Sequence, residues 1–352
     1  MSTGETRLVK FMLIGAGNVG LRFLNLVESK RAILRERLDL ELILVGVADR
    51  SGVARNPEGL PVSEIVALKQ GGRGVGEHPR WGVPAETGLE MVQAGGADLL
   101  VEASPANMVD GQPALACIEA ALSDGMHVVT ANKAPLVLAF PRLAQLARDN
   151  GVQLRYDATV AGGLPAVNIG QRDLAVAEIH RLEGVLNLTT NYVLTRMAQD
   201  GMSYEEALSH AQAAGHAETD PTLDVEGWDA ANKLVILAHS VLRFPARLDD
   251  VEVTGIRGVD EEALKAAAAE GMRIKLVATA EAEGDGYRLS VRPTRLPADH
   301  PLAQLGPKQM GIVFHTDING SISAAVVEDT PIPTAAAALR DVGEIYAGEG
   351  GI

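Results

Sequence analysis

The chain has 352 residues, 47% of them hydrophobic, and carries 46 acidic against 31 basic residues, for a formal net charge of −15. This length predicts two domains, and the negative charge argues against nucleic acid or an anionic membrane as a partner. The longest apolar runs fall short of the roughly 20 residues that span a bilayer, and the amino terminus has no signal-peptide pattern, so we expect a soluble, cytoplasmic protein.

Cysteine and histidine give little support for a disulfide or a metal centre. The single cysteine, Cys117, lies in an alanine-rich helical pattern, where the role of a small buried hydrophobic residue is expected. The 8 histidines have neither HxxxH spacing nor CxxC companions. A reducing compartment fits this composition, and a zinc site has little support.

A strand, a glycine turn and a helix open the chain. The apolar run 8–14 is followed by Gly15-Ala16-Gly17-Asn18-Val19-Gly20 and by a helical pattern over residues 21–38. In this context Gly15 permits a tight turn, Gly17 lets a pyrophosphate approach the backbone, and Gly20 allows close packing of helix on strand. The helix start supplies amide donors. The pattern predicts dinucleotide binding, with a merely structural glycine turn as the alternative.

A second apolar strand, over residues 42–48, ends at Asp49 and Arg50. An acid at this place is the usual partner of an adenosine ribose, while Arg50 could meet a 2′-phosphate. We therefore expect NAD to be usable and NADP as well. The glycine-rich segment 71–82 is predicted to be a mobile surface loop.

Strands then alternate with helices. The expected strands are 98–103, 127–130 and 153–156, and the expected helices are 113–123 and 139–150. Such alternation predicts an α/β domain with a Rossmann-type parallel sheet and right-handed crossovers.

Two strand ends of this sheet carry candidate cofactor residues. Ser104 and Pro105 follow one strand, and Asn132 and Lys133 follow another. Ligands bind outside the carboxyl ends of strands in open α/β sheets, so Lys133 is expected to point into the crevice where the nicotinamide lies. A surface lysine that caps a turn is the alternative.

The pattern changes after the first domain, which is predicted to cover residues 1–156. Residues 178–187 indicate a strand, and hairpins are predicted with turns at Asp285-Gly286 and Asn319-Gly320. Antiparallel hairpins with helices predict an α+β second domain over residues 157–330, for catalysis and dimerisation. The final alanine-rich helix, within residues 331–352, is expected to pack back on the first domain.

The stretch 215–233 places five carboxylates before a single lysine, Lys233. Residues 229–242 have the recurrence of a largely buried helix, so Asp229 and Lys233, at positions i and i+4, share one helical face. Burial favours the neutral form of a lysine and the neighbouring carboxylate favours the charged form, so Lys233 is a candidate for proton transfer. The alternative is an ordinary helix salt bridge behind a solvated acidic loop.

With these features in place, the chain closely resembles the homoserine dehydrogenase family over nearly its whole length. The matching motifs are GAGNVG at Gly15, HVVTANKAPL at His127, DATVAGGLP at Asp157, GVLNLTTNYVLTRM at Gly184 and AQAAGHAETDPTLDVEGWDAANKL at Ala211. The resemblance implies interconversion of L-homoserine and L-aspartate 4-semialdehyde with NAD or NADP, in the pathway to threonine, methionine and isoleucine. The motif VEASPAN at Val101, and the absence of aspartokinase and regulatory domains, are similar to a stand-alone, threonine-insensitive, archaeal-type enzyme. The resemblance also implies a homodimer.

The resemblance further implies roles for individual residues. Glu218 and Asp224 would hold the amino group of the substrate, and Asp229 would orient its reacting end. Lys133 and Lys233 would serve its hydroxyl or carbonyl oxygen, which needs a cationic donor. The other substrate-binding residues implied are Asn187, Thr189, Tyr192 and Gly215. The cofactor-binding residues implied are Gly15, Gly17, Asn18, Val19, Gly20, Asp49, Arg50, Ser104, Pro105, Asn132 and Lys133.

The segment that begins at Asp157 resembles the family's site for a monovalent cation, Na⁺ or K⁺. The implied ligands are Asp157, Val160, Gly162 and Leu164. Two segments depart from the family's pattern: Leu188 stands where many members have glycine, and the acidic run 326–333 replaces a glycine-rich run that borders the cofactor. The second departure bears on cofactor affinity and NADP use.

Two other functions are weighed against this one. An enzyme of the aspartate-semialdehyde dehydrogenase kind needs a nucleophilic cysteine in the crevice, and Cys117 lies in the wrong kind of place. A non-enzymatic dinucleotide sensor could share the fold, but it has no need of proton-transfer groups such as Lys133, Asp229 and Lys233.

Overall fold

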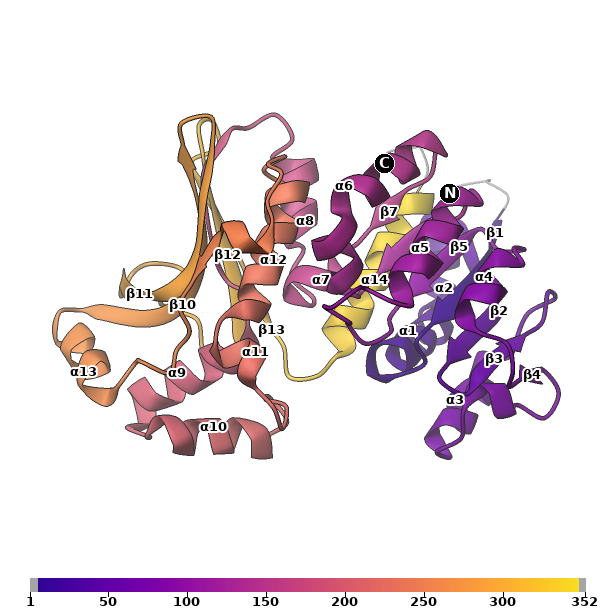
Figure 1. Ribbon diagram of the computed structural model, residues 1–352, viewed down its shortest axis with the longest axis horizontal. Helices are drawn as coiled ribbons and strands as arrows, with labels where there is room; N and C mark the ends of the chain where they lie inside the picture. The colour runs from indigo at the N-terminus through magenta and orange to yellow at the C-terminus, as the bar shows by residue number, and fades with distance from the viewer. Residues whose placement is uncertain (1–5, 348–352) are drawn as a thin grey trace. The chain divides into compact units, whose positions relative to one another are not determined.

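The computed structural model describes residues 6–347, which fall into two compact units. One unit holds the chain up to Gly163 together with the chain from Pro331 onward, and the other holds residues 164–330 (Figure 1). The sequence predicted the first boundary between residues 156 and 157, whereas residues 157–163 lie in the first unit. Every helix among the described residues is too short or too polar to cross a membrane.

The first unit is built on a seven-stranded sheet in the order β4-β3-β2-β1-β5-β6-β7. The strands are β1 (Arg7–Ile14), β2 (Leu40–Asp49), β3 (Gly52–Arg55), β4 (Gly82–Val83), β5 (Leu99–Glu102), β6 (His127–Thr130) and β7 (Leu154–Arg155). All pairs among β1, β2, β5, β6 and β7 are parallel, which confirms the predicted Rossmann-type sheet. The sequence missed β3 and β4, which extend the sheet antiparallel, because strands of 4 and 2 residues give little periodicity.

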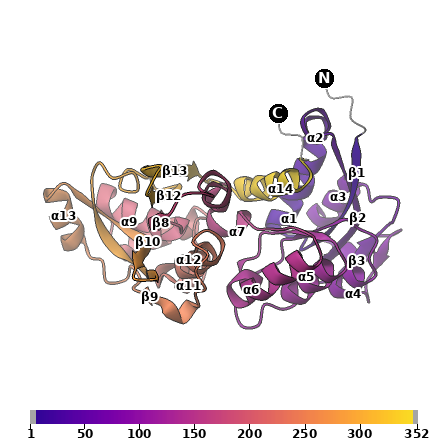
Figure 2. The same ribbon diagram turned by 90° about the horizontal axis from the view of Figure 1, so that it is seen from above.

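Helices cover both faces of this sheet (Figure 2). They are α1 (Asn18–Ser29), α2 (Arg31–Leu38), α3 (Val62–Gln70), the 3₁₀ turn η1 (Val75–Glu77), α4 (Gly88–Gln93), α5 (Ala114–Ser123), α6 (Lys133–Asp149), α7 (Ala158–Ala161) and α14 (Ile332–Tyr346). Fully buried residues such as Phe11, Leu13, Phe23 and Leu24 join β1 and α1 in one core. Helix α14 packs against α1 and α7, so the end of the chain completes the first unit.

Three elements of the first unit differ from the sequence prediction. The helix expected over residues 21–38 is two helices, interrupted at Lys30. The segment 71–82 is an ordered part of the fold, because Val75 is fully buried and its N–H reaches Asp49. Helix α6 begins at Lys133 instead of residue 139, because the side chain of Asn132 caps it and Ala139 is only a local break.

The second unit is a six-stranded sheet in the order β13-β12-β8-β10-β11-β9, with helices packed on it. Its strands are β8 (Ile179–Val185), β9 (Val251–Val253), β10 (Met272–Glu283), β11 (Gly286–Pro297), β12 (Gln309–Thr316) and β13 (Ser321–Val327). Its helical segments are α8 (Ala166–Asn168), η2 (Ile169–Asp173), α9 (Leu188–Asp200), α10 (Tyr204–Ala213), α11 (Thr222–Val225), α12 (Trp228–Ser240), η3 (Leu248–Asp250) and α13 (Glu261–Ala269). The antiparallel pairs β10–β11 and β12–β13 confirm both predicted hairpins and the α+β class.

Candidate active site

The glycine turn between β1 and α1 has the shape of a dinucleotide cradle. Gly15 has φ +94°, and a Cβ there would lie 2.5 Å from the backbone of Ser104. A Cβ on Gly20 would lie 2.0 Å from the oxygen of Gly15. Gly17 has neither reason to be glycine, since its φ is −98° and a Cβ would meet nothing within 4 Å. The close approach of a ligand accounts for glycine at position 17, so the turn fits a pyrophosphate.

Residues Asn18 and Val19 begin α1, and no acidic residue occupies its first turn. Free backbone N–H groups and the helix dipole therefore favour an anion at this end of α1.

The carboxylate of Asp49, at the end of β2, is already held by the protein. It accepts hydrogen bonds from Ser51 N at 2.8 Å, Ser51 Oγ at 2.5 Å and Val75 N at 3.2 Å, and Lys69 Nζ lies 2.5 Å away. Burial raises the pKa of Asp49, but Lys69 and these hydrogen bonds outweigh burial and lower it below its usual value. The neighbouring Arg50 is exposed. Lys69 thus compensates the negative charge of Asp49, which would otherwise repel a 2′-phosphate.

A buried acid that the sequence reasoning missed joins the two polar strand ends. Glu102, the last residue of β5, is fully buried and accepts bonds from the backbone N (2.9 Å) and the hydroxyl of Ser104, and from Thr130 Oγ1 at 3.3 Å. Asn132 Nδ2 lies 3.4 Å from Ser104 Oγ and from the oxygen of Pro105. Burial raises the pKa of Glu102 to about 7. The signal was an acid at the end of an otherwise apolar strand.

Asp229 and Lys233 form a shielded pair on α12. Lys233 Nζ lies 2.8 Å from Asp229 Oδ2, and the exposed fractions of the two side chains are 14% and 7%. The same amine donates to the oxygen of Leu186 at 2.6 Å. The segment before α9 therefore holds the lysine together with its own helix.

Asn187 connects this pair to the acidic loop. Its Nδ2 donates to Asp229 Oδ2 at 2.8 Å and to Asp224 Oδ1 at 2.7 Å, while its Oδ1 caps α9. Thr189 Oγ1 lies 2.8 Å from Asp224 Oδ2. One amide thus separates two carboxylates that would otherwise repel each other. Leu188, which stands where many members of the resembled family have glycine, is the first residue of α9.

The remaining substrate-binding candidates are less closely tied to this network. Glu218 is exposed, and its carboxylate makes no hydrogen bond or ion pair with the described residues. Gly215 has φ +74° after α10. Tyr192 is buried, and its hydroxyl lies 2.7 Å from His210 Nδ1. The structure thus brings together Asn187, Thr189, Asp224, Asp229 and Lys233, and leaves Glu218 free for another partner.

Comparison with known proteins gives the same answer for both units. Residues 15–157 match the family model described as "Homoserine dehydrogenase, NAD binding domain", and residues 165–342 match the model "Homoserine dehydrogenase". The chain is 36% identical to the homoserine dehydrogenase of Methanocaldococcus jannaschii, over 95% of this chain and 98% of the relative. The chain belongs to the homoserine dehydrogenase family. The resemblance to this family and the Rossmann-type fold predicted from the alternation of strands and helices are both confirmed, and the protein is an oxidoreductase with an NAD-binding domain.

Other members of the homoserine dehydrogenase family show the same extent of similarity. A protein of Pseudomonas canavaninivorans named NAD(+)-dependent homoserine dehydrogenase is 34% identical, over 96% of each chain. The crystal structure of a putative homoserine dehydrogenase from Archaeoglobus fulgidus has a TM-score of 0.87 and 38% identity, and covers 97% of this chain and 100% of that one. The matches extend over both units, not the dinucleotide-binding part alone.

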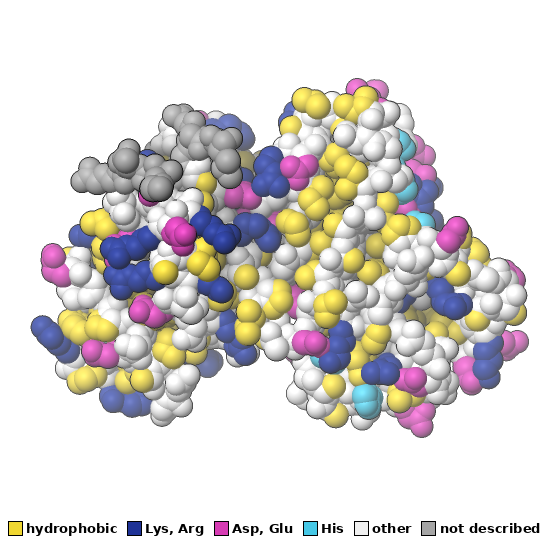
Figure 3. All heavy atoms as spheres, turned by 180° about the vertical axis from the view of Figure 1, so that it is seen from behind, with side chains coloured by type: hydrophobic (Ala, Val, Ile, Leu, Met, Phe, Trp, Pro, Cys, Tyr) yellow, Lys and Arg dark blue, Asp and Glu magenta, His cyan; other side chains and the backbone are white. Residues whose placement is uncertain are grey.

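The alternative of an enzyme with a nucleophilic cysteine loses support. Cys117 is fully buried in α5, and burial raises the pKa of its thiol to about 12, so it is no nucleophile. On the face in Figure 3, acidic and basic side chains are interspersed over the unit 164–330.

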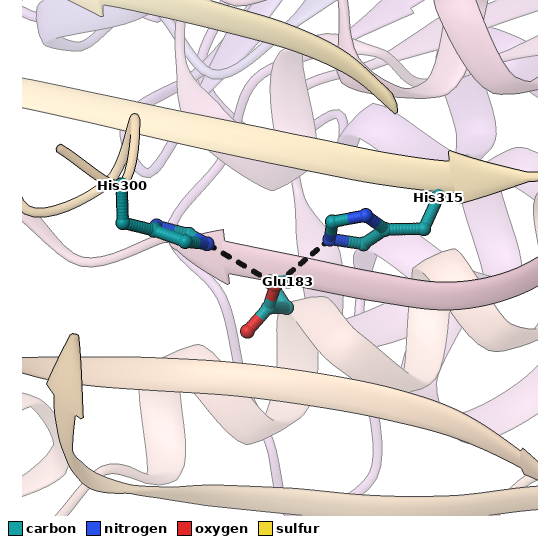
Figure 4. A group of neighbouring side chains, drawn as sticks. All are labelled: Glu183, His300 and His315. Atoms are coloured by element: carbon teal, nitrogen blue, oxygen red, sulfur yellow. Dashed lines mark hydrogen bonds and ion pairs between the residues drawn. The ribbon is translucent and has the colours of Figure 1, made fainter. Parts of the chain in front are cut away.

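Glu183, His300 and His315 form a cluster that the sequence did not reveal (Figure 4). Glu183 Oε2 lies 2.9 Å from His315 Nε2 and 3.4 Å from His300 Nε2, and Glu183 Oε1 pairs with Arg181 at 2.9 Å. His300 Nδ1 accepts the N–H of Leu302, so its proton lies on Nε2 and points at Glu183. With that proton and a nearby guanidinium, the cluster is a hydrogen-bonded network and not a metal centre.

Proposed function

We propose that this chain catalyses the NAD-dependent interconversion of L-homoserine and L-aspartate 4-semialdehyde, with Lys233 as a proton-transfer group. The observation that carries the proposal is the buried pair of Asp229 and Lys233, held by Leu186 and Asn187, in a chain of this family. A surface salt bridge needs no such third and fourth partner.

The residues of the glycine turn fit the cofactor. The N–H groups at the start of α1 would hold the pyrophosphate, with Gly17 leaving room for it. Ser104, Pro105 and Asn132 would border the nicotinamide. When bound, NAD supplies the acceptor for the hydride that leaves the substrate carbon.

Lys233 has one direction left for the substrate. Two of its three ammonium protons have acceptors, Asp229 Oδ2 and the oxygen of Leu186. The third position would face the reacting oxygen: a neutral amine there accepts the hydroxyl proton during oxidation, and an ammonium returns it to the carbonyl oxygen during reduction. Asp229 holds the amine in place. Lys133, the first residue of α6, is the second proposed donor to this oxygen.

The acidic loop would bind the α-ammonium of the substrate. An ammonium needs anionic partners, and Glu218 presents a carboxylate without a bond to any described residue. Asp224 would be the second partner, with Asn187 and Thr189 fixing its two oxygens. Tyr192 and Gly215 would shape the surroundings of this loop.

Use of NADP is part of the proposal, because Lys69 compensates Asp49 and Arg50 is exposed. The acidic segment 326–333 is partly compensated as well, since Lys308 Nζ lies 2.7 Å from Asp329 Oδ1. We expect NAD and NADP both to support turnover.

A homodimer also belongs to the proposal. Strand β13 is an edge of the second sheet, contains no charged residue, and exposes Ser321, Ser323, Ala325 and Val327 on one side. An uncharged, unprotected sheet edge favours pairing with a second copy. A cytoplasmic location remains a prediction from the sequence.

The test is an assay of homoserine oxidation with NAD and with NADP, in which the absorbance of the NADH or NADPH formed is measured. Activity with L-homoserine but not with D-homoserine or L-serine is expected. Absence of activity with either cofactor, in a protein that binds NADH, would favour a dinucleotide sensor. Preference for NADP above a hundredfold would contradict NAD as the cofactor.

A further inference from the structure

The segment expected to hold a monovalent cation lies around a guanidinium group instead. Arg340, on α14, donates a hydrogen bond from Nη2 to Asp157 Oδ2 and another from Nη1 to the oxygen of Gly163 at 3.3 Å. Asp157 is 1% exposed. The one carboxylate of the expected ligand set, and a backbone oxygen of the same segment, therefore already have a positive partner.

The charges around Asp157 also disfavour an added cation. Asp341, the next residue of α14, is fully buried and accepts the N–H of Asp157 at 2.9 Å. The buried carboxylate of Asp157 requires a positive charge, and Arg340 supplies it. A Na⁺ or K⁺ ion on Asp157 would lie against the guanidinium and be repelled.

These contacts join the two places where the chain crosses between units. Residues 157–163 are the last of the first unit before the chain leaves it, and α14 follows directly on its return at Pro331. The two segments also pack closely, because a Cβ on Gly163 would lie 2.5 Å from Pro333 Cβ. A positive charge at Asp157 thus fastens the outgoing segment to the returning helix.

We infer that Arg340 replaces the monovalent cation in this chain. Its guanidinium is a built-in cation that neutralises Asp157 and holds residues 157–163 against α14. The protein consequently needs neither Na⁺ nor K⁺ for its stability or its turnover. The expected ligand set of Asp157, Val160, Gly162 and Leu164 does not fit an ion here, because Arg340 already pairs with Asp157. The sequence did not reveal this partner, since it lies 183 positions beyond Asp157.

The test compares thermal unfolding in NaCl, KCl and choline chloride at equal ionic strength. The wild-type melting temperature is expected to be the same in all three salts. Arg340→Ala removes the guanidinium partner of the buried carboxylate of Asp157, so the melting temperature should fall by about 5–10 °C in choline chloride. Na⁺ or K⁺ should restore much of this loss in a saturable way, as should guanidinium at low millimolar concentration.

Two variants keep the test decisive. Arg142→Ala removes an arginine paired with Glu119 on the surface of the same unit, and its unfolding should not depend on the cation. Arg340→Lys keeps the positive charge and serves as the second variant in case Arg340→Ala does not fold. Its melting temperature should be the same with Na⁺, K⁺ and choline. A saturable, Na⁺- or K⁺-specific rise in wild-type melting temperature would overturn the inference, as would an Arg340→Ala protein that unfolds alike in all salts. The readout needs no substrate, so it stands apart from the proposed reaction.

Discussion

Lys233 Nζ lies 2.8 Å from Asp229 Oδ2, one turn earlier on α12, and the backbone oxygen of Leu186 accepts from the same amine at 2.6 Å. The amine is therefore held from two elements of the second unit and is only slightly exposed. A second acid–lysine pair of the same spacing, Glu261 and Lys265 on α13, is 53% and 72% exposed and makes no third contact of this kind. The i,i+4 spacing is the same in the two pairs, whereas the burial, the third partner and the acid itself, aspartate or glutamate, differ.

Lys233→Met should lower kcat by about 10²- to 10⁴-fold, the usual effect of removing a positioned acid–base group. NADH binding, measured by fluorescence titration, should remain near the wild-type value, because Lys233 lies in the unit that carries no part of the glycine turn. Lys265→Met is the matched control and should leave both quantities unchanged. A Lys233→Met protein with wild-type kcat would make the pair a structural salt bridge.

Glu218→Ala should act on substrate binding and not on stability. The carboxylate is exposed and makes no bond to a described residue, so its removal should leave the melting temperature unchanged. Loss of a charge-assisted hydrogen bond to the α-ammonium should raise KM for homoserine about 10- to 100-fold, with a smaller change in kcat. Glu205→Ala, an exposed acid on α10, is the control. Equal kinetic effects of the two variants would remove Glu218 from the site.

Lys275 on β10 should make the stability of the second unit depend on pH. The side chain is buried and donates to Asn191 Oδ1, Thr195 Oγ1 and the oxygen of Leu305, none of which is a carboxylate. Burial lowers its pKa from 10.5 to about 8. Between these two pH values the unfolded chain binds more protons than the folded one, so the free energy of unfolding should rise with pH, by at most about 1.4 kcal/mol per pH unit.

The comparison with Lys275→Met isolates this contribution. Each unit contains one tryptophan, so urea unfolding of the second unit can be followed by Trp228 fluorescence in a Trp81→Phe background. The difference in unfolding free energy between the Lys275 protein and its methionine variant should change from pH 8 to 10.5 in favour of lysine. Parallel pH profiles of the two proteins would show that the amine is not buried in this way.

Removal of metal ions should have no effect on the second unit. The Nε2 proton of His300 and the guanidinium of Arg181 both point at Glu183, so no lone pair of His300 is available to Zn²⁺ on that side. Dialysis against EDTA should leave the melting temperature unchanged, and added Zn²⁺ should not raise it. A saturable stabilisation by Zn²⁺ that disappears in His315→Ala would establish a metal site there.

Short-range sequence patterns predicted several elements of the fold and of the candidate site. The glycine turn at Gly15 and the i,i+4 pair of Asp229 and Lys233 are short-range features, since spacing along a helix or a turn fixes which groups meet. The hairpin at Asn319-Gly320 is of the same kind, because its turn residues set the register of β12 and β13. These elements are found in the structure where the sequence placed them.

Contacts between residues far apart in the chain could not be predicted from such patterns. The sequence marked Asp49 as an acid with room for a ribose, but Lys69 and Val75, 20 and 26 positions later, already hold it. Glu183, His300 and His315 come together because β8 pairs with β12 and the loop after β11 folds over them.

The sequence by itself determined the class of the fold, the family and the candidate chemistry, because these depend on periodicity, turn residues and motif spacing. Tertiary structure alone decided which charges are already neutralised. The motif predicted Asp157 as a ligand of a monovalent cation, whereas in the structure Asp157 is paired with Arg340. The charge state of a buried acid depends on what lies within a few ångströms of it, and the fold draws those neighbours from anywhere along the chain.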